Sequence, residues 1–291
     1  MLEAWTLKRI LWSLRKAQLP IGLKDLVLDV GSGGSPHPAS DVLLDKYIDP
    51  VHRHSPLVID RPLVLADACK MPFRDKTFDF VIAFHILEHM ENPALFLREL
   101  QRVGKAGYIE TPNAIFERLV PYDVHLLEIM NLDNTLLINK KKAAKPDYFL
   151  NELNLIANSP AWNRFFFGNP DYFHVRYFWK DEIKFNIMNP EVACDWFIEP
   201  EMRQLADGEI TTKAPIESLR SMGLSMLRKW YKLRKRRKPN LTDLLVCPEC
   251  HGNLIIDKAF ISCHNCGISY PNQPLPDFNN KHFTTKQQAC N

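Results

Sequence analysis

The strongest signal of the fold is the segment Leu28-Asp29-Val30-Gly31-Ser32-Gly33-Gly34-Ser35-Pro36. The apolar run that leads into it stops at a glycine, which is typical of a buried strand that ends in a tight turn. Glycines at such a turn let the backbone approach a bound ligand closely. Pro36 stands where a dinucleotide fingerprint needs Gly or Ala, so the turn argues against a nicotinamide or flavin enzyme.

Short apolar runs recur after this turn and predict an α/β fold with a parallel-rich sheet and helices on both faces. We expect further strands at 42–44, 63–65, 78–84 and 107–110. A helix over 94–103 is expected to begin after Asn92-Pro93. Beyond residue 121 the pattern changes, and alternating residues predict two added β-hairpins, at 125–139 and 174–188.

Acidic residues close two of the expected strands. Asp45 ends the second strand and Asp67 ends the third. An acid at the end of the second strand can accept hydrogen bonds from both ribose hydroxyls of an adenosine. The interval between Gly33 and Asp45 is short and contains two prolines, so the first helix of such a fold must be abbreviated or replaced by a loop.

These motifs resemble, in order and spacing over residues 26–113, the class I S-adenosylmethionine-dependent methyltransferases. In that family an acid equivalent to Asp45 holds the ribose, with Asp49 as the runner-up here, and an acid equivalent to Asp67 lies beside the adenine. The segments 71–79 and 85–89 also match family signatures. The resemblance implies a Rossmann-like fold that binds S-adenosyl-L-methionine through Asp29, Gly31, Ser32, Gly33, Asp45, Asp67, Ala68, Phe84 and His85.

The reaction that the resemblance implies needs no obvious catalytic residue. Methyl transfer from a sulfonium releases a neutral leaving group, so alignment of the reactants can supply most of the acceleration. A general base helps only if the acceptor is a hydroxyl or a protonated amine. His125 and His174 could serve as that base, although structural roles are commoner for single histidines, and we assign no catalytic residue. We expect His85 to line the cofactor or acceptor pocket and His89 to pack against the following helix.

Four of the seven cysteines predict a metal site near the C-terminus. Cys247 and Cys250 form one Cys-x-x-Cys pair, and Cys263 and Cys266 form a second. Two such pairs supply four thiolates for a closed, tetrahedral and therefore structural zinc site. A unit this small depends on the metal to fold, because it cannot bury a sufficient core.

The segment 241–278 resembles the small zinc-ribbon proteins that activate tRNA, rRNA and translation-factor methyltransferases as a separate subunit. The similarity rests on Leu244 to Cys250, on the second cysteine pair with Gly267, and on Tyr270-Pro271. In that family the ribbon covers apolar surface of the methyltransferase and stabilises it. The resemblance implies that this chain carries such a partner within itself.

Composition and charge limit the compartment and the partners. The 291 residues are 46% hydrophobic and 24% charged, no run is long enough for a membrane span, and the N-terminus lacks a signal-peptide pattern, so we expect a cytoplasmic protein. Net charge is only +3, yet Arg228–Lys238 has eight Lys or Arg and no acid. That run could bind nucleic acid or, with the amphipathic N-terminus, the surface of an anionic membrane, but a solvated linker is the commoner explanation.

The expected organisation has five parts. They are an amphipathic helix (1–22), a methyltransferase domain (23–227, acceptor region about 114–227), a basic linker (228–240), a zinc ribbon (241–279) and a tail (280–291).

Three functions compete. The leading hypothesis is a methyltransferase for a small molecule or a glycan or lipid-linked acceptor, in which the ribbon stabilises or docks the catalytic domain. The second is an RNA or translation-protein methyltransferase, against which Thr111-Pro112-Asn113 stands in place of the Asn/Asp-Pro-Pro-Tyr motif used on amino groups. The third is a non-catalytic protein that binds S-adenosylmethionine.

Overall fold

The computed structural model describes residues 12, 15–48, 56–122, 124–142, 159–194, 215–235 and 239–283. Most of the expected helix 1–22 lies outside these residues, and its described part includes the 3-10 turn η1 (Arg15–Gln18). Asp49 and most of the tail 280–291 also lie outside them.

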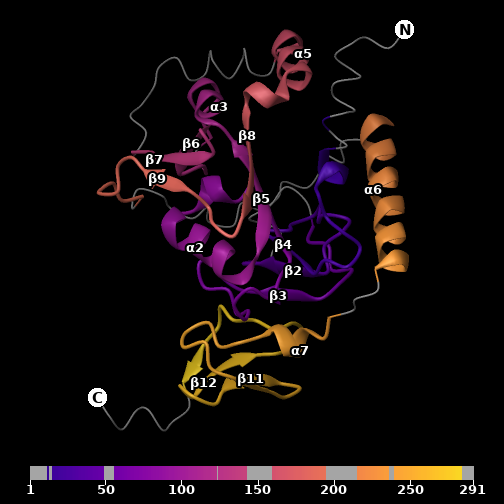
Figure 1. Ribbon diagram of the computed structural model, residues 1–291, viewed down its shortest axis with the longest axis vertical. Helices are drawn as coiled ribbons and strands as arrows, with labels where there is room; N and C mark the ends of the chain where they lie inside the picture. Colours follow the sequence, from indigo (N-terminus) through magenta and orange to yellow (C-terminus); the bar gives the residue numbers. More distant parts are fainter. Residues whose placement is uncertain are drawn as a thin grey trace, which may run out of the picture.

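A six-stranded sheet forms the centre of the molecule (Figure 1). Its strands lie in the order β3-β2-β1-β4-β5-β8, and β8 alone runs antiparallel to its neighbour. The strand bounds are β1 (Val27–Val30), β2 (Val42–Asp45), β3 (Leu63–Leu65), β4 (Phe80–Phe84), β5 (Ala106–Pro112) and β8 (His174–Lys180). No helix occurs between β1 and β2, which confirms that the prolines there replace the first helix with a loop.

Side chains alternate along each buried strand, so each strand contributes apolar residues to both faces of the sheet. A core covers each face. Leu28 and Val30 of β1 pack into the larger core together with α2 (Pro93–Val103). Val27 points to the opposite face and packs into a smaller core with Leu19 of the N-terminal segment.

Helix α2 follows from local sequence signals. The Asn92 side chain caps it by accepting a hydrogen bond from Leu95 N at 3.1 Å, and a proline occupies its first turn. Its inward face buries four apolar side chains, each worth about 1.5–3 kcal/mol relative to exposure: Phe96, Leu97, Leu100 and Val103.

The acceptor half contains one of the two expected hairpins. β6 (Leu127–Leu132) and β7 (Thr135–Lys140) pair antiparallel as predicted. The prediction of a second hairpin at 174–188 is wrong. β8 pairs with β5, and β9 (Phe185–Ile187) pairs parallel with β7. Alternation shows that a segment is a strand but not which strand it will pair with, and here both partners are distant in sequence.

The remaining short helices are η3 (Leu87–His89), which follows β4, and α3 (Ala114–Leu119), α5 (Pro160–Gly168) and η4 (Pro170–Tyr172), which lie after β5.

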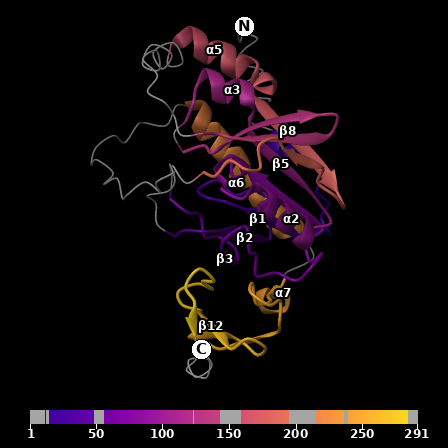
Figure 2. The same ribbon diagram turned by 90° about the vertical axis from the view of Figure 1, so that its left-hand side faces the viewer.

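The C-terminal unit is a small antiparallel sheet preceded by α7 (Leu241–Leu244) (Figure 2). Its strands are β10 (Leu254–Ile256), β11 (Phe260–Cys263), β12 (Ile268–Pro271) and β13 (His282–Phe283). β10 and β11 form an antiparallel hairpin between the two cysteine pairs.

Much of the basic run 228–238 belongs to a helix that packs beside the main sheet. Residues 228–234 continue α6 (Pro215–Arg234), which lies beside the main sheet (Figure 1). Arg228 donates to the carbonyl of Ser40 at 3.1 Å, and Lys235 donates to the carbonyl of Asp25 at 2.8 Å and forms an ion pair with Asp41. Two cations of the run are therefore bound within the molecule. No helix in the described part of the chain is long and apolar enough to cross a membrane.

Candidate functional site

The candidate site lies where the order of the main sheet reverses, between β1 and β4. In open α/β sheets, ligands bind outside the carboxyl ends of the strands at this point. The glycine turn follows β1, and His85 follows β4. The two turns touch, because a Cβ atom at Gly31 would lie 2.7 Å from Cδ1 of Ile86.

The glycine turn has the shape of a ligand cradle. Gly31 and Gly33 have φ angles of +66° and +53°, a region that favours glycine. A Cβ atom at Gly33 would meet no atom closer than 4.0 Å, so the backbone there borders open space. Between them, Ser32 Oγ is buried and has no hydrogen-bond partner among the described residues. A bound polar ligand would satisfy that hydroxyl.

The two predicted acids lie at the ends of neighbouring strands. Asp45 accepts a hydrogen bond from Gly33 N at 3.0 Å, which ties the glycine turn to the end of β2. Asp67 follows β3, accepts from Cys69 N at 2.7 Å and has Lys46 Nζ 3.9 Å from its other oxygen. Its side chain is about half exposed. The structure thus brings both acids to the same edge as the glycines.

Three further residues that were predicted to contact the cofactor have structural partners in the protein. Asp29 is buried and accepts a hydrogen bond from His37 N at 2.6 Å, so its carboxylate supports the loop behind the glycine turn. Ala68 is buried after Asp67, and Phe84 ends β4 with its ring against Tyr108. Their contacts with a cofactor stay predictions.

His85 lies between two buried carboxylates. Its Nδ1 is 3.3 Å from Glu88 and its Nε2 is 3.6 Å from Glu110, and its φ angle is +52°. Burial lowers the pKa of His85, but the hydrogen bonds and charges of Glu110 and Glu88 outweigh burial and raise the pKa to about 9. His85 is therefore cationic at neutral pH and can orient or donate, but it cannot act as a base there.

A buried ionic network below His85 was missed by the sequence reasoning. Glu110, fully buried on β5, accepts hydrogen bonds from Arg15 Nε at 2.9 Å and from the Tyr108 hydroxyl at 2.7 Å. Arg176 on β8 donates to the same hydroxyl at 3.0 Å. The available signal was an acidic residue in the middle of an apolar strand, which must be paired if it is buried.

Aromatic side chains cover the end of β5. Trp12 lies against the His174 ring, with centroids 4.9 Å apart, and stacks on the Arg15 guanidinium at 4.1 Å. His174 in turn contacts the rings of His85 and Phe166. Burial lowers the pKa of His174, and the nearby His85 and Arg15 charges add to that effect. His174 is thus placed at the site, as a neutral side chain.

The other candidate base, His125, lies further along the acceptor half. Its Nδ1 bonds to the buried carboxylate of Glu117, and its ring packs against His89 with centroids 4.7 Å apart. His89 Nδ1 donates to the carbonyl of Val124 at 2.9 Å. We expected His89 to pack against the following helix. It instead contacts the segment before β6.

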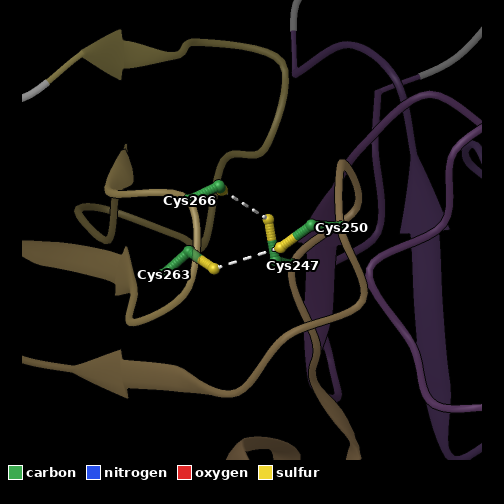
Figure 3. Close-up of side chains that lie close together, drawn as sticks. All are labelled: Cys247, Cys250, Cys263 and Cys266. Carbon is green, nitrogen blue, oxygen red and sulfur yellow. Dashed lines mark hydrogen bonds between the residues drawn. The ribbon is translucent and has the colours of Figure 1, made fainter. Parts of the chain in front are cut away.

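The four C-terminal cysteines converge (Figure 3). The Cys247 and Cys266 sulfurs are 3.7 Å apart, and the Cys250 and Cys263 sulfurs are 3.4 Å apart. These separations are too long for disulfides and are close to the ~3.8 Å edge of a tetrahedral zinc–thiolate site. His251 and His264 are exposed and lie outside the cluster. The residues fit a structural zinc ion.

Comparison with known proteins assigns the two parts of the chain. Residues 46–109 match the family described as "Methyltransferase domain", and residues 238–271 match the family described as "Trm112p-like protein". The chain thus contains a region that matches a methyltransferase domain and, after it, a region that matches Trm112p-like proteins.

Individual relatives of the methyltransferase domain are similar over limited regions. Ajmaline N-methyltransferase of Rauvolfia serpentina is 40% identical over 43 residues, which span 15% of this chain and 15% of that protein's length. Among solved structures, a chain of the complex between the Haloferax volcanii Trm112 methyltransferase activator and a methyltransferase is 14% identical, with a TM-score of 0.36, covering 60% of this chain and 95% of that one. The PH0226 protein from Pyrococcus horikoshii is 20% identical, with a TM-score of 0.31, covering 45% and 72%.

The methyltransferase domain offers groups that fit S-adenosylmethionine. The orphaned hydroxyl of Ser32 and the open space beside Gly33 suit a polar ligand that approaches the backbone closely. The accessible carboxylate of Asp67 can accept a hydrogen bond at the same edge.

The C-terminal unit (residues 239–283) contains nearly all of the Trm112p-like region and is called the Trm112p-like domain below; it holds the methyltransferase domain by backbone hydrogen bonds at two places. Leu65 N donates to Pro276 O at 2.9 Å, and Phe278 N donates to Leu65 O at 2.7 Å. Further along, Val246 N donates to Pro72 O at 3.0 Å. Buried residues of both domains form one continuous core. The Trm112p-like domain therefore covers the free edge of β3, which would otherwise expose unpaired backbone groups.

Proposed function

We propose that this protein transfers the methyl group of S-adenosylmethionine to a small molecule or to a glycan, lipid-linked glycans included. The observation that carries this proposal is the closure of the N-terminal segment over the carboxyl end of β5. Arg15 is itself buried and pairs with Glu110, 95 residues further along the chain. Trp12 lies on the other side of the same arginine.

This cover places an aromatic wall beside His85, whose ring contacts His174. The wall continues from His174 through Phe166 to Phe116, with Phe166 and Phe116 centroids 5.2 Å apart. Apolar and aromatic walls with a few charged groups are typical of small-ligand sites. The wall therefore favours a small molecule or a sugar as the acceptor.

In this proposal the chain's own residues bind the cofactor, orient the acceptor and exclude water. When bound, S-adenosylmethionine would supply an electrophilic methyl carbon with a neutral thioether as the leaving group. Asp45 and Asp67 hold the cofactor at the edge of the sheet, and the glycine turn lets it approach the backbone. His85, cationic and fixed between Glu88 and Glu110, orients an oxygen of the acceptor. Alignment of this kind can supply most of the acceleration.

In this proposal the Trm112p-like domain supports the methyltransferase domain. Its backbone hydrogen bonds to Leu65 lie two residues before Asp67, and Asn279 donates to the carbonyl of Lys46 at 2.8 Å. The ends of β2 and β3, which carry both predicted cofactor acids, are thus held from outside. This arrangement favours a stabilising role over a second active site.

A second candidate is an RNA or translation-protein methyltransferase, which the Trm112p-like match favours. Exposed cations on α6 could contact phosphates: Lys229, Lys232 and Arg234. Two observations count against it. The first is that Arg228 and Lys235 are already bound within the molecule. The second is that Asn113, which belongs to the segment in place of the Asn/Asp-Pro-Pro-Tyr motif, has a structural role. It caps α3, and its amide donates to Tyr172 O at 2.7 Å.

An acceptor screen with methyl-labelled cofactor distinguishes the candidates. Pools of sugar nucleotides, lipid-linked glycans, small metabolites, structured RNA and translation proteins are incubated with the full-length chain. Label in a glycan or small-molecule pool supports the proposal, and label only in RNA or protein supports the second candidate. Calorimetric binding of the cofactor without transfer to any pool would favour a non-catalytic protein.

A further inference from the structure

Three side chains outside the predicted cofactor contacts form a second convergent cluster. Glu88, His89 and His125 each place one possible ligand atom within 4.8 Å of the others. Glu88 is 1% exposed and His125 is 9% exposed, whereas His89 is open to solvent. The cluster joins η3 to the segment before β6, so the tertiary structure brings it together.

The hydrogen bonds of His125 leave one ring nitrogen for a ligand. Its Nδ1 bonds to Glu117 Oε1, and Lys141 Nζ lies 3.3 Å from the other oxygen of that carboxylate. A carboxylate paired with a lysine accepts hydrogen bonds, so Nδ1 carries the proton. The remaining nitrogen, Nε2, then presents a lone pair.

The same reasoning applies to His89. Its Nδ1 is 2.9 Å from the carbonyl oxygen of Val124, which can only accept, so this nitrogen also carries the proton. Histidines that bind metals almost always donate their other ring N–H to a carboxylate or a backbone carbonyl. His125 and His89 show one example of each arrangement.

Glu88 supplies the carboxylate and is held in the same manner. Its Oε2 accepts a hydrogen bond from the Thr111 hydroxyl at 2.9 Å, and its Oε1 faces His85 at 3.3 Å. Each oxygen has a second lone pair, so these contacts orient the group without exhausting it. All three candidate ligands are therefore fixed by partners behind them.

We propose that Glu88, His89 and His125 bind a divalent transition metal of the zinc class in a two-histidine, one-carboxylate site. Metal–ligand distances of about 2.0–2.2 Å require the ligand atoms to move together by roughly 1 Å. A small shift of the exposed His89 ring that keeps its hydrogen bond to Val124 can supply much of that movement. Three protein ligands leave a coordination position open, as in catalytic zinc sites and unlike the closed four-cysteine site.

Cobalt binding to the full-length chain tests this site independently of methyl transfer. The protein is purified with zinc in its four-cysteine site and titrated with Co²⁺. We expect about one Co²⁺ per chain, with weak visible bands and no thiolate-to-cobalt charge-transfer band. His89→Ala, which changes an exposed side chain, should weaken this binding at least tenfold, and His125→Ala should do the same.

The control is His282→Ala, an exposed histidine of β13, which should bind Co²⁺ as the wild type does. Circular dichroism checks that each variant is folded, which matters most for the buried His125. Stoichiometric binding that persists in the folded His89→Ala chain would overturn the proposal. Absence of any Co²⁺ beyond the four-cysteine site, or a charge-transfer band in the added cobalt, would overturn it as well.

Discussion

Leu65 of the methyltransferase domain pairs with Asp277 of the Trm112p-like domain in a parallel bridge. This bridge extends the main sheet beyond β3 with a segment more than 200 residues away in sequence. Because Asp67 lies two residues after Leu65, the edge that carries a predicted cofactor acid is completed by the zinc-binding unit. Stability, metal content and cofactor affinity should therefore be coupled.

Loss of one zinc ligand should destabilise the entire chain. Cys263→Ser removes a thiolate from the closed site, and the unit cannot hold its fold without the metal. Since both domains share one core, we expect a loss on the order of 3 kcal/mol or more in the free energy of unfolding. Calorimetry should show one transition at lower temperature. Cys69→Ser, outside the cluster, should change little; an unaltered methyltransferase transition in Cys263→Ser would contradict the coupling.

Asp67→Asn should weaken binding of S-adenosylmethionine. A hydrogen bond to a charged group is worth about 1.5–3 kcal/mol, which corresponds to roughly a 10- to 100-fold increase in Kd. Isothermal titration calorimetry measures this directly. Asp75→Asn is the matched control, because Asp75 is exposed and pairs with Arg102 away from the site. Equal affinity of the Asp67 variant and the wild type would remove Asp67 from the cofactor site.

The two turn glycines should respond differently to alanine. Gly31→Ala places a methyl group 2.7 Å from Ile86 at a positive φ angle, so it should lower the melting temperature markedly. Gly33→Ala meets open space, so its stability cost should be limited to about 1–2 kcal/mol of backbone strain. Its methyl group should instead obstruct the cofactor and raise Kd. A Gly33 variant that binds the cofactor normally would show that the ligand does not approach there.

The stabilising effect of Glu110 should depend on pH. Burial alone would raise the pKa of Glu110, but hydrogen bonds from His85, Arg15 and Tyr108 hold it well below the ordinary value. A depressed folded-state pKa contributes stability above about pH 4.5, and this contribution is lost as pH falls towards the folded-state pKa. Glu110→Gln should thus destabilise the protein strongly at pH 7 and progressively less below pH 4.5. Chemical denaturation at pH 7 and at a pH below 4.5 measures the difference in unfolding free energy between the variant and the wild type. A difference that does not change with pH would contradict the depressed pKa of Glu110.

Two lysines of the basic run should behave differently. Lys235 is buried and paired with Asp41, so Lys235→Ala leaves an uncompensated charge and should cost about 3 kcal/mol or more. Lys232 is exposed, and Lys232→Ala should stay within about 0.5 kcal/mol of the wild type. Urea denaturation distinguishes these outcomes. Equal effects would indicate that α6 does not pack as described.

Parts of the fold could be predicted because their signals are local. The turn after β1, the cap of α2 and the β6–β7 hairpin each depend on residues close in sequence. The pairing of β8 with β5 could not be predicted, because alternation along residues 174–180 is compatible with many partners. The same limit hid the ion pair of Arg15 with Glu110.

Residue type and spacing were enough to predict the succession of strands and turns along the chain, the acids at the ends of β2 and β3, and the cluster of four cysteines. These features depend on backbone preference and on residues close together in sequence. The folded chain was needed to show that Arg15 pairs with Glu110, that the Trm112p-like domain completes the edge of β3 at Leu65, and that His125 meets Glu88 and His89. These contacts are strong because water is excluded from them. Exclusion of water is a property of the folded chain, so local sequence cannot predict such contacts.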